Sequence, residues 1–223
     1  GSRQAFVSAA ANAPMDTALR AGIALYTAGE AHAAHEPWEA VWLDLPDGDD
    51  GDSDNDERLF HGLIQFTGAI YHAQTRNWAG AVGLAESAQG YLGSLPMRYR
   101  GINTDDVVAA CRRLEGDPER IERGPASPLY YKGRRLTAAD LEIEGITTAA
   151  GVVADEYDSY DFDVVDAAIE YAREEARGAE SQFIGLLTAF VDDREHRGIV
   201  YDRLRQNVER RQRRADDVAG LFE

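Results

Sequence analysis

The residues best suited to chemistry lie between positions 32 and 42, where the sequence reads His-Ala-Ala-His-Glu-Pro-Trp-Glu-Ala-Val-Trp. This stretch holds two imidazoles, two carboxylates and two indoles. On an α-helix, residues four apart lie on one face, so we expect His32 to lie over Glu36 and His35 over Glu39. Such a face can bind a metal ion or a small ligand, or it can pack against another part of the protein.

One interpretation of this face is a divalent-metal site. His35 and Glu39 would hold the ion with His61 or His72 as a third ligand, and Glu36 would act as general base on a bound water. The precedent is the His-Glu-x-x-His helix of metalloproteases, in which two ligands four apart share one face. The match is incomplete, because a glutamate replaces the second histidine and a proline between the two ligands bends the helix.

The other interpretation is structural. His35, Glu39, Gln65 and His72 would form a buried hydrogen-bonded network that fixes how two helices pack, with each polar group satisfied by another. The sequence favours this interpretation because it contains no complete catalytic set. The candidate residues for a site or a polar network are His32, His35, Glu36, Glu39, Trp42, Arg58, His61, Gln65 and His72.

Two facing helices are needed to bring these residues together. Apolar spacing predicts one helix over residues 15–26, a bend at Gly29, and a second helix through residues 32–42 that is kinked at Pro37. The second helix would carry the first half of the candidate site.

The other half of the candidate site follows a run dense in carboxylates, residues 46–57, which predicts a loop. This run lacks the glycine and the final glutamate of a calcium-binding EF-hand loop. A long helix should follow, from about residue 55 to residue 77, with a polar stripe facing residues 32–42 across an antiparallel pair. The stripe consists of His61, Gln65, Gly68 and His72.

The remaining elements are also predicted to be mostly helical. A break in composition at residues 124–128 separates a domain over residues 15–122 from a helical extension over residues 123–223. A short β-hairpin is expected from residues 129–132 and 141–143. The further predicted helices are 78–94, 104–116, 146–157, 164–172, 183–191, and a last one that begins after Gly198 and reaches Arg214.

The charge of the chain is strongly one-sided. It has 40 acidic and 23 basic residues, a net charge of −17, and Lys132 is its single lysine. Such self-repulsion weakens a fold at low ionic strength and is screened by concentrated salt, so the sequence predicts a halophilic, salt-adapted protein with an acidic surface. The same charge argues against nucleic acid as a partner, because phosphates would meet a repulsive field.

The single cysteine and the apolar runs indicate the compartment. Cys111 has no second cysteine with which to form an internal disulfide, and it lies in a helical apolar pattern typical of core residues. No apolar run approaches the roughly 18 residues that a membrane helix needs. We therefore expect a soluble, cytoplasmic protein.

Several motifs in the first half resemble a known family. They are His35-Glu36-x-x-Glu39-x-x-Trp42, then Glu57-Arg58-x-Phe60-x-Gly62-Leu63-Ile64-Gln65, then Tyr71-His72 and Trp78-x-Gly80-Ala81. Together they resemble the domain-of-unknown-function family 309 over about residues 15–122, with the rest similar to an extension found in haloarchaeal members. The resemblance implies a compact all-helical domain and no assigned activity. Two positions depart from the family pattern, Pro37 in place of a helix former and His61 in place of glutamine.

The sequence thus predicts an all-α, multi-helix bundle that allows one short β-hairpin in its carboxy-terminal half. The favoured function is a structural or protein-interaction module with a buried His/Glu/Gln network, and the alternative is a divalent-metal-binding protein or metal-dependent hydrolase. No cofactor is specified, and a divalent metal is the alternative. The expected partner is another protein or a second copy, with neither nucleic acid nor membrane involved.

Overall fold

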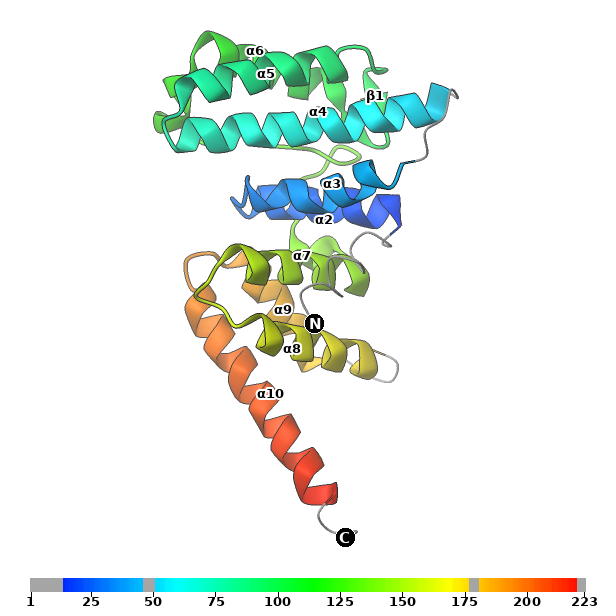
Figure 1. Ribbon diagram of the computed structural model, residues 1–223, viewed down its shortest axis with the longest axis vertical. Coiled ribbons are helices and arrows are strands. Elements are labelled where there is room, and N and C mark those ends of the chain that lie inside the picture. The colour runs from blue at the N-terminus through cyan, green and yellow to red at the C-terminus, as the bar shows by residue number, and fades with distance from the viewer. Residues whose placement is uncertain (1–13, 46–50, 177–180, 220–223) are drawn as a thin grey trace.

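The computed structural model describes residues 14–45, 51–176 and 181–219, and helices dominate these ranges (Figure 1). The predicted all-α class is therefore confirmed. The first half contains α2 (Met15–Thr27), η1 (Ala33–His35), α3 (Glu36–Leu43), α4 (Gly51–Gln74), α5 (Trp78–Leu92), β1 (Arg98–Tyr99), β2 (Ile102–Asn103), α6 (Thr104–Gly116) and η2 (Pro118–Glu122). The second half contains η3 (Ala138–Asp140), α7 (Ile143–Glu156), α8 (Phe162–Glu175), α9 (Gln182–Asp192) and α10 (Arg197–Ala219).

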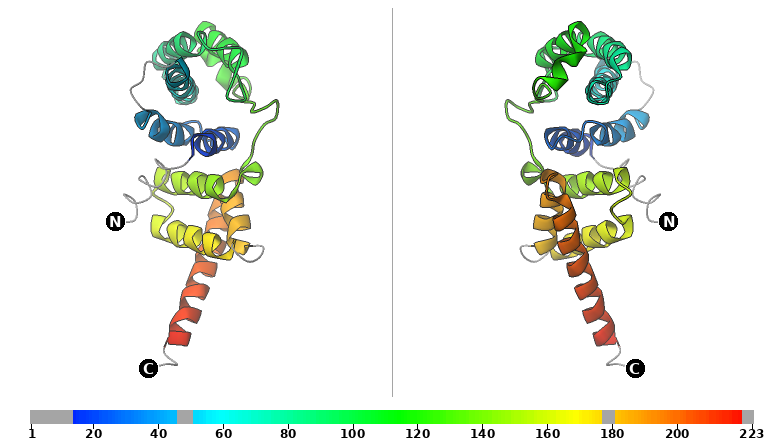
Figure 2. Two further views of the ribbon diagram at one scale, coloured as in Figure 1. Left: turned by 90° about the vertical axis from the view of Figure 1, so that its right-hand side faces the viewer. Right: turned by 90° about the vertical axis from the view of Figure 1, so that its left-hand side faces the viewer.

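The helices stack in layers. The pair α2 and α3 lies between α4 to α6 on one side and α7 to α9 on the other, and α10 extends beyond α8 and α9 (Figure 1). The two side views in Figure 2 show the same projection of α10 away from the other helices. None of the helices in the described ranges is both long enough and apolar enough to cross a membrane.

The close packing of α2 on α3 depends on a glycine. Trp38 is fully buried, its indole lies against Gly22, and its Nε1 donates to the carbonyl oxygen of Leu19 at 3.1 Å. A Cβ atom at residue 22 would overlap the indole ring. The predicted end of the first helix is confirmed, since Gly29 has a φ of +90° and turns the chain toward η1.

The predicted acidic loop was drawn too long. Residues 46–50 lie outside the described residues, but α4 already begins at Gly51, so the later carboxylates belong to a helix. Carboxylates near the positive end of a helix dipole are favourable, which is why a dense acidic run can be helical there. Asp56 is even buried, with 4% of its surface exposed, and accepts hydrogen bonds from Arg100 at 2.5 Å and Tyr99 at 2.9 Å.

The helices after α4 follow the prediction closely. The side chain of Asn77 caps α5 by accepting from the amide of Gly80 at 3.1 Å. Gly62 lets α5 approach α4, because a Cβ atom there would lie 2.5 Å from Leu92. The helix α6 has the predicted bounds, residues 104–116, with two aspartates in its first turn.

The predicted hairpin was wrong in position. The paired strands are β1 and β2, which run antiparallel and lie before α6 rather than in the second half. Of the predicted segment, Tyr131 forms isolated bridges to Ile102 and Arg134. Leu141 is not in a strand, and Ile143 begins α7.

The last helix also differs from the prediction. Gly198 does not separate two helices, since α10 begins at Arg197 and continues through it. Arg197 itself is buried, with 3% of its surface exposed. The helix therefore starts inside the protein and then leaves it.

Contacts between the two halves include hydrogen bonds as well as packing of α2 on α7. Arg20 donates to the carbonyl oxygen of Asp140 at 2.8 Å, and the hydroxyl of Tyr26 donates to the carbonyl oxygen of Ser127 at 2.7 Å. The division into domains at residues 122 and 123 stays a prediction.

Candidate functional site

The stretch 32–42 does not form one kinked helix. A 3₁₀ turn, η1, ends at His35, and α3 begins at Glu36 with Pro37 in its first turn. Proline lacks an amide hydrogen and fits the first turn of a helix, so the chain starts a new helix there rather than bending an old one. His32 and Glu36 therefore do not share a helical face in the expected way.

One group of candidate residues assembles where η1, α3, α4 and α7 meet. The Nδ1 atom of His32 lies 3.0 Å from both carboxylate oxygens of Glu156 in α7. The Nε2 atom of His35 lies 3.9 Å from Glu39, so the expected pairing of residues 35 and 39 occurs. We call His32, His35, Glu36, Glu39 and Glu156 the His/Glu cluster.

Aromatic contacts join the His/Glu cluster to α4. The rings of His32 and His35 meet edge to face with centroids 4.9 Å apart, and the His32 ring lies 4.7 Å from that of Tyr71. The side chains of His32 and Glu39 are 45% and 48% exposed. The cluster is thus half open to solvent, and Glu39 is not buried as the predicted network requires.

The electrostatics of the cluster centre on Glu36. Burial, which has the largest effect, and the nearby carboxylates of Asp155 and Glu156 together raise the pKa of this carboxyl group to about 7. Burial also lowers the pKa of His35 below its usual value. A carboxyl group with a pKa of about 7 is suited to exchanging a proton with a bound molecule near neutral pH.

A second group of candidate residues lies at the other end of α3. His61 stacks on Tyr91 of α5 with ring centroids 4.1 Å apart, and Trp42 lies 4.8 Å from the His61 ring. The histidine at position 61, where the family pattern has glutamine, thus packs between two aromatic side chains. This placement is typical of packing rather than of metal ligation.

The remaining candidates have local partners. Arg58 pairs with Asp54 one turn earlier at 2.8 Å, and the Nδ1 atom of His72 accepts a hydrogen bond from the side-chain amide of Asn77 at 2.8 Å. Gln65 is half-buried and forms no side-chain hydrogen bond to any residue that the structure describes. The single network of His35, Glu39, Gln65 and His72 is therefore not assembled.

The metal interpretation finds no ligand set in the described part of the chain. No three His, Cys, Asp or Glu side chains within residues 14–45, 51–176 and 181–219 are arranged to hold a metal ion. The predicted ligands are instead distributed between the two ends of α3 and the end of α4. His61 instead packs between Trp42 and Tyr91, and His72 accepts a hydrogen bond from Asn77.

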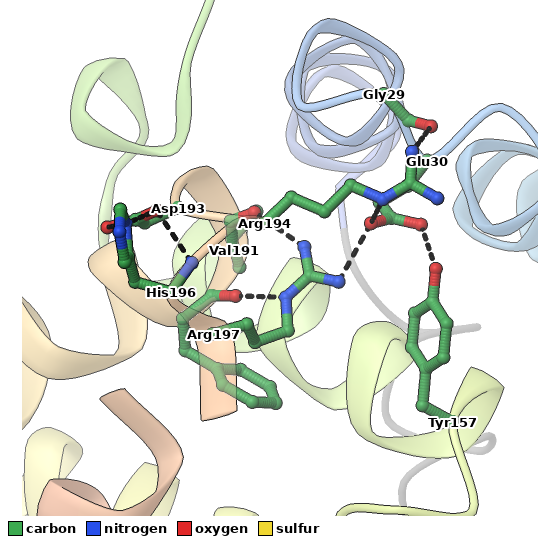
Figure 3. Close-up of polar contacts among 9 residues, drawn as sticks. Gly29, Glu30, Tyr157, Val191, Asp193, Arg194, His196 and Arg197 are labelled. Atoms are coloured by element: carbon green, nitrogen blue, oxygen red, sulfur yellow. Dashed lines mark hydrogen bonds and ion pairs between the residues drawn. The ribbon is translucent and has the colours of Figure 1, made fainter. Parts of the chain in front are cut away.

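The strongest polar assembly was missed by sequence reasoning. Glu30 is buried, with 4% of its surface exposed, and receives Arg197 at 2.8 Å and the hydroxyl of Tyr157 at 2.6 Å (Figure 3). Arg194 approaches the same carboxylate at 3.4 Å. We call Glu30, Tyr157, Arg194 and Arg197 the Glu30 anchor.

Arg197 completes the anchor with backbone contacts. Its guanidinium donates to the carbonyl oxygens of Phe190 at 2.7 Å and Val191 at 3.0 Å, in the last turn of α9. Burial, followed by the hydrogen bond to Glu30, raises the pKa of Tyr157. Tyr157 and Arg197 lie more than 120 positions after Glu30 in the chain, so no local spacing in the sequence could indicate their contacts with it.

Comparisons with known proteins agree with the resemblance that the motifs indicate. A search of curated proteins finds no match. A family model, however, matches part of the first half, beginning within α2 and ending within α5, which is a shorter segment than residues 15–122. The matched residues, 19–84, are similar to the family described as Domain of unknown function (DUF309).

Proposed function

We propose that this protein is a structural or protein-interaction module in which the amino-terminal helices hold the carboxy-terminal helices and so fix α10 in a projecting position. The single observation that carries the proposal is the Glu30 anchor. It joins the turn after α2 to the end of α7, the end of α9 and the start of α10. A projecting helix with a fixed start is suited to presenting a surface to a partner.

The anchor is suited to fixing geometry because its polar groups are satisfied. The Glu30 carboxylate has a donor on each oxygen, and the Arg197 guanidinium donates to one carboxylate and two carbonyl oxygens. A buried ion pair is costly unless its remaining hydrogen-bonding groups are paired in this way. Such an arrangement favours one relative position of the helices over its neighbours.

The His/Glu cluster supports the same proposal. His32, within the family-like segment, pairs with Glu156 of α7, so the residue that looked like a ligand contacts the carboxy-terminal half. The pair is half exposed and contributes about 0–1 kcal/mol. The pair therefore helps to set how the two halves align, and it supplies little of the free energy that holds them together.

Unfolding of the full chain tests this proposal. All three tryptophans, Trp38, Trp42 and Trp78, lie in the first half, so tryptophan fluorescence reports on that half while far-ultraviolet circular dichroism reports on every helix. If the halves form one unit, the two signals change at the same denaturant concentration. Midpoints that differ by more than the fitting error would show that the halves unfold separately, and the proposal would fail.

The alternative of a metal-binding protein is favoured by one observation, the raised pKa of Glu36. A carboxyl group whose charge is penalised by two neighbouring carboxylates would be relieved by a bound cation. Elemental analysis of protein purified without chelator tests this directly. A transition metal at close to one per chain would favour the alternative, and less than about a tenth of that would count against it.

The location and the class of partner stay predictions from composition. The chain's net charge of −17 supports a protein partner or a second copy over nucleic acid. The same charge supports a salt-adapted protein, and the single cysteine supports a cytoplasmic location.

A further inference from the structure

The arginines of α10 are not all used by the protein itself. Arg205 pairs with Asp202 and Glu209, and Arg211 pairs with Glu174 and Glu175. These pairs hold two of the α10 arginines against acidic side chains nearby. The arginines at positions 210 and 214 are exposed and form no ion pair with any residue in the described ranges.

These two arginines line a cleft. The cleft has a volume of about 260 Å³ and lies where α10 passes the start of α9 and the end of α8. Its polar lining comes from Asn207, Arg210, Arg211 and Arg214 of α10, from Gln182 of α9 and from Glu175 at the end of α8. The four α10 residues follow the spacing i, i+3, i+4 and i+7, so they lie on one helical face.

One guanidinium in the cleft is held in place. The Arg211 side chain donates to Glu174 at 2.7 Å and pairs with Glu175, and its guanidinium carbon lies 4.3 Å from the centre of the Tyr171 ring. The hydroxyl of Ser181 donates to the same Glu175 at 2.7 Å. Arg211 and Glu175 therefore form a rigid wall beside the two unpaired guanidinium groups.

The start of α9 adds to the positive potential of the cleft. Ser181 caps α9 by accepting from the amide of Ile184, and the first helical residue, Gln182, lines the cleft. Free amides and the helix dipole favour an anion at such a terminus. The three arginines that line the cleft exceed the charge of Glu174 and Glu175 by one, in a chain whose net charge is −17.

We propose that this cleft binds the phosphate group of a small molecule. Guanidinium groups match the oxygens of phosphate with two parallel hydrogen bonds, and Arg210 and Arg214 have donors available for this purpose. Its volume, about 260 Å³, lies below the roughly 300–1,000 Å³ of sites for drug-sized ligands, so the ligand is small. A long polyanion would be repelled by the acidic remainder of the chain.

Calorimetric titration of the full chain with inorganic phosphate tests the site, with total ionic strength held constant by sodium chloride. Arg210→Gln combined with Arg214→Gln should weaken binding about tenfold or more, because two charge-assisted contacts are lost. The matched control combines Arg203→Gln with Arg213→Gln, which removes the same charge from exposed positions of α10 outside the cleft. We expect the control to bind phosphate within about twofold of the unmodified protein.

Three results would overturn the proposal. They are no saturable binding of phosphate by the unmodified protein, an equal loss in both double variants, or tighter binding of a single-stranded oligonucleotide that both variants weaken equally. O-phosphoserine serves as a second probe in the same titration. Tighter binding of O-phosphoserine than of inorganic phosphate would identify a phosphate ester as the ligand, and the reverse would identify the free anion.

Discussion

Replacing Arg197 by methionine should destabilise the protein severely. Arg197 and Glu30 are 3% and 4% exposed, so the substitution leaves a buried carboxylate without its main counter-charge. Removing one partner of a buried ion pair costs about 3–5 kcal/mol. The lower end of this range is expected, because Tyr157 still donates to Glu30 and the exposed Arg194 can remain close.

The assay is thermal and urea unfolding of the full chain. For a chain of this size, each kcal/mol lowers the melting temperature by about 2–4 °C, so a loss of about 3 kcal/mol should lower it by roughly 6–12 °C. Arg203→Met is the matched control, since Arg203 is exposed on the same helix, and its effect should stay within about 0.5 kcal/mol. The urea midpoint of Arg197→Met should fall by a corresponding amount.

A double-mutant cycle decides whether the charge pair is responsible. Glu30→Gln removes the orphaned charge, so the double variant Glu30→Gln with Arg197→Met should be less destabilised than the sum of the two single variants. We expect a coupling free energy of about 1–3 kcal/mol. Strict additivity, or an Arg197→Met variant as stable as the control, would refute the reasoning about the Glu30 anchor.

Three further predictions concern other parts of the fold. Gly22→Ala should cost about 1–3 kcal/mol because its Cβ atom overlaps Trp38, whereas Gly83→Ala in α5, with open space around it, should stabilise the protein by up to about 1 kcal/mol in the same melts. Burial raises the pKa of Glu36 to about 7, so its folded form prefers the proton and stability should fall as pH rises from about 4.5 to 7. The full shift corresponds to about 3 kcal/mol, which solvent screening at this half-buried site reduces to about 1–2 kcal/mol, and Glu36→Gln should abolish that loss. Added salt should raise the melting temperature of the unmodified protein, given its net charge of −17; a melting temperature independent of salt between low and molar concentrations would contradict the salt-adapted interpretation.

Protonation of His35 makes an opposing contribution to the dependence of stability on pH. The pKa of His35 is lowered, so its neutral form is favoured in the folded state and stability is lost as pH falls below its ordinary value of 6.5. In a Glu36→Gln variant this histidine effect should remain, with stability declining only on the acidic side. A variant that still loses stability as pH rises toward 7 would show that Glu36 is not the group responsible.

Much of the fold could be predicted because its signals are local. Thr104 with two following aspartates starts α6 and Gly116 ends it, and the predicted bounds match. The acidic run before residue 57 was misread because charge density was taken as evidence against a helix. At the first turns of α4 the same carboxylates are favoured by the helix dipole, and Asp56 has Arg100 and Tyr99 as partners that no local pattern specifies.

In the candidate site, too, local contacts could be predicted and distant ones could not. The pairing of His35 with Glu39 is local and was predicted, whereas the partner of His32 is Glu156, which is 124 positions away. Helical spacing also placed His61 with His72, but it cannot say how far α4 is rotated about its axis. In the structure the His61 ring lies between Trp42 of α3 and Tyr91 of α5.

The position of the missed contacts bears on what the family-like segment does in this chain. Glu30 and His32 lie within residues 19–84, but their partners Glu156, Tyr157 and Arg197 all lie beyond that match. A motif confined to the segment therefore cannot specify these contacts, and a chain that lacked the extension would leave a carboxylate and an imidazole without them. Under the function proposed above, the segment's polar turn holds helices supplied by the same chain, and the projecting α10 is the part that would meet another molecule.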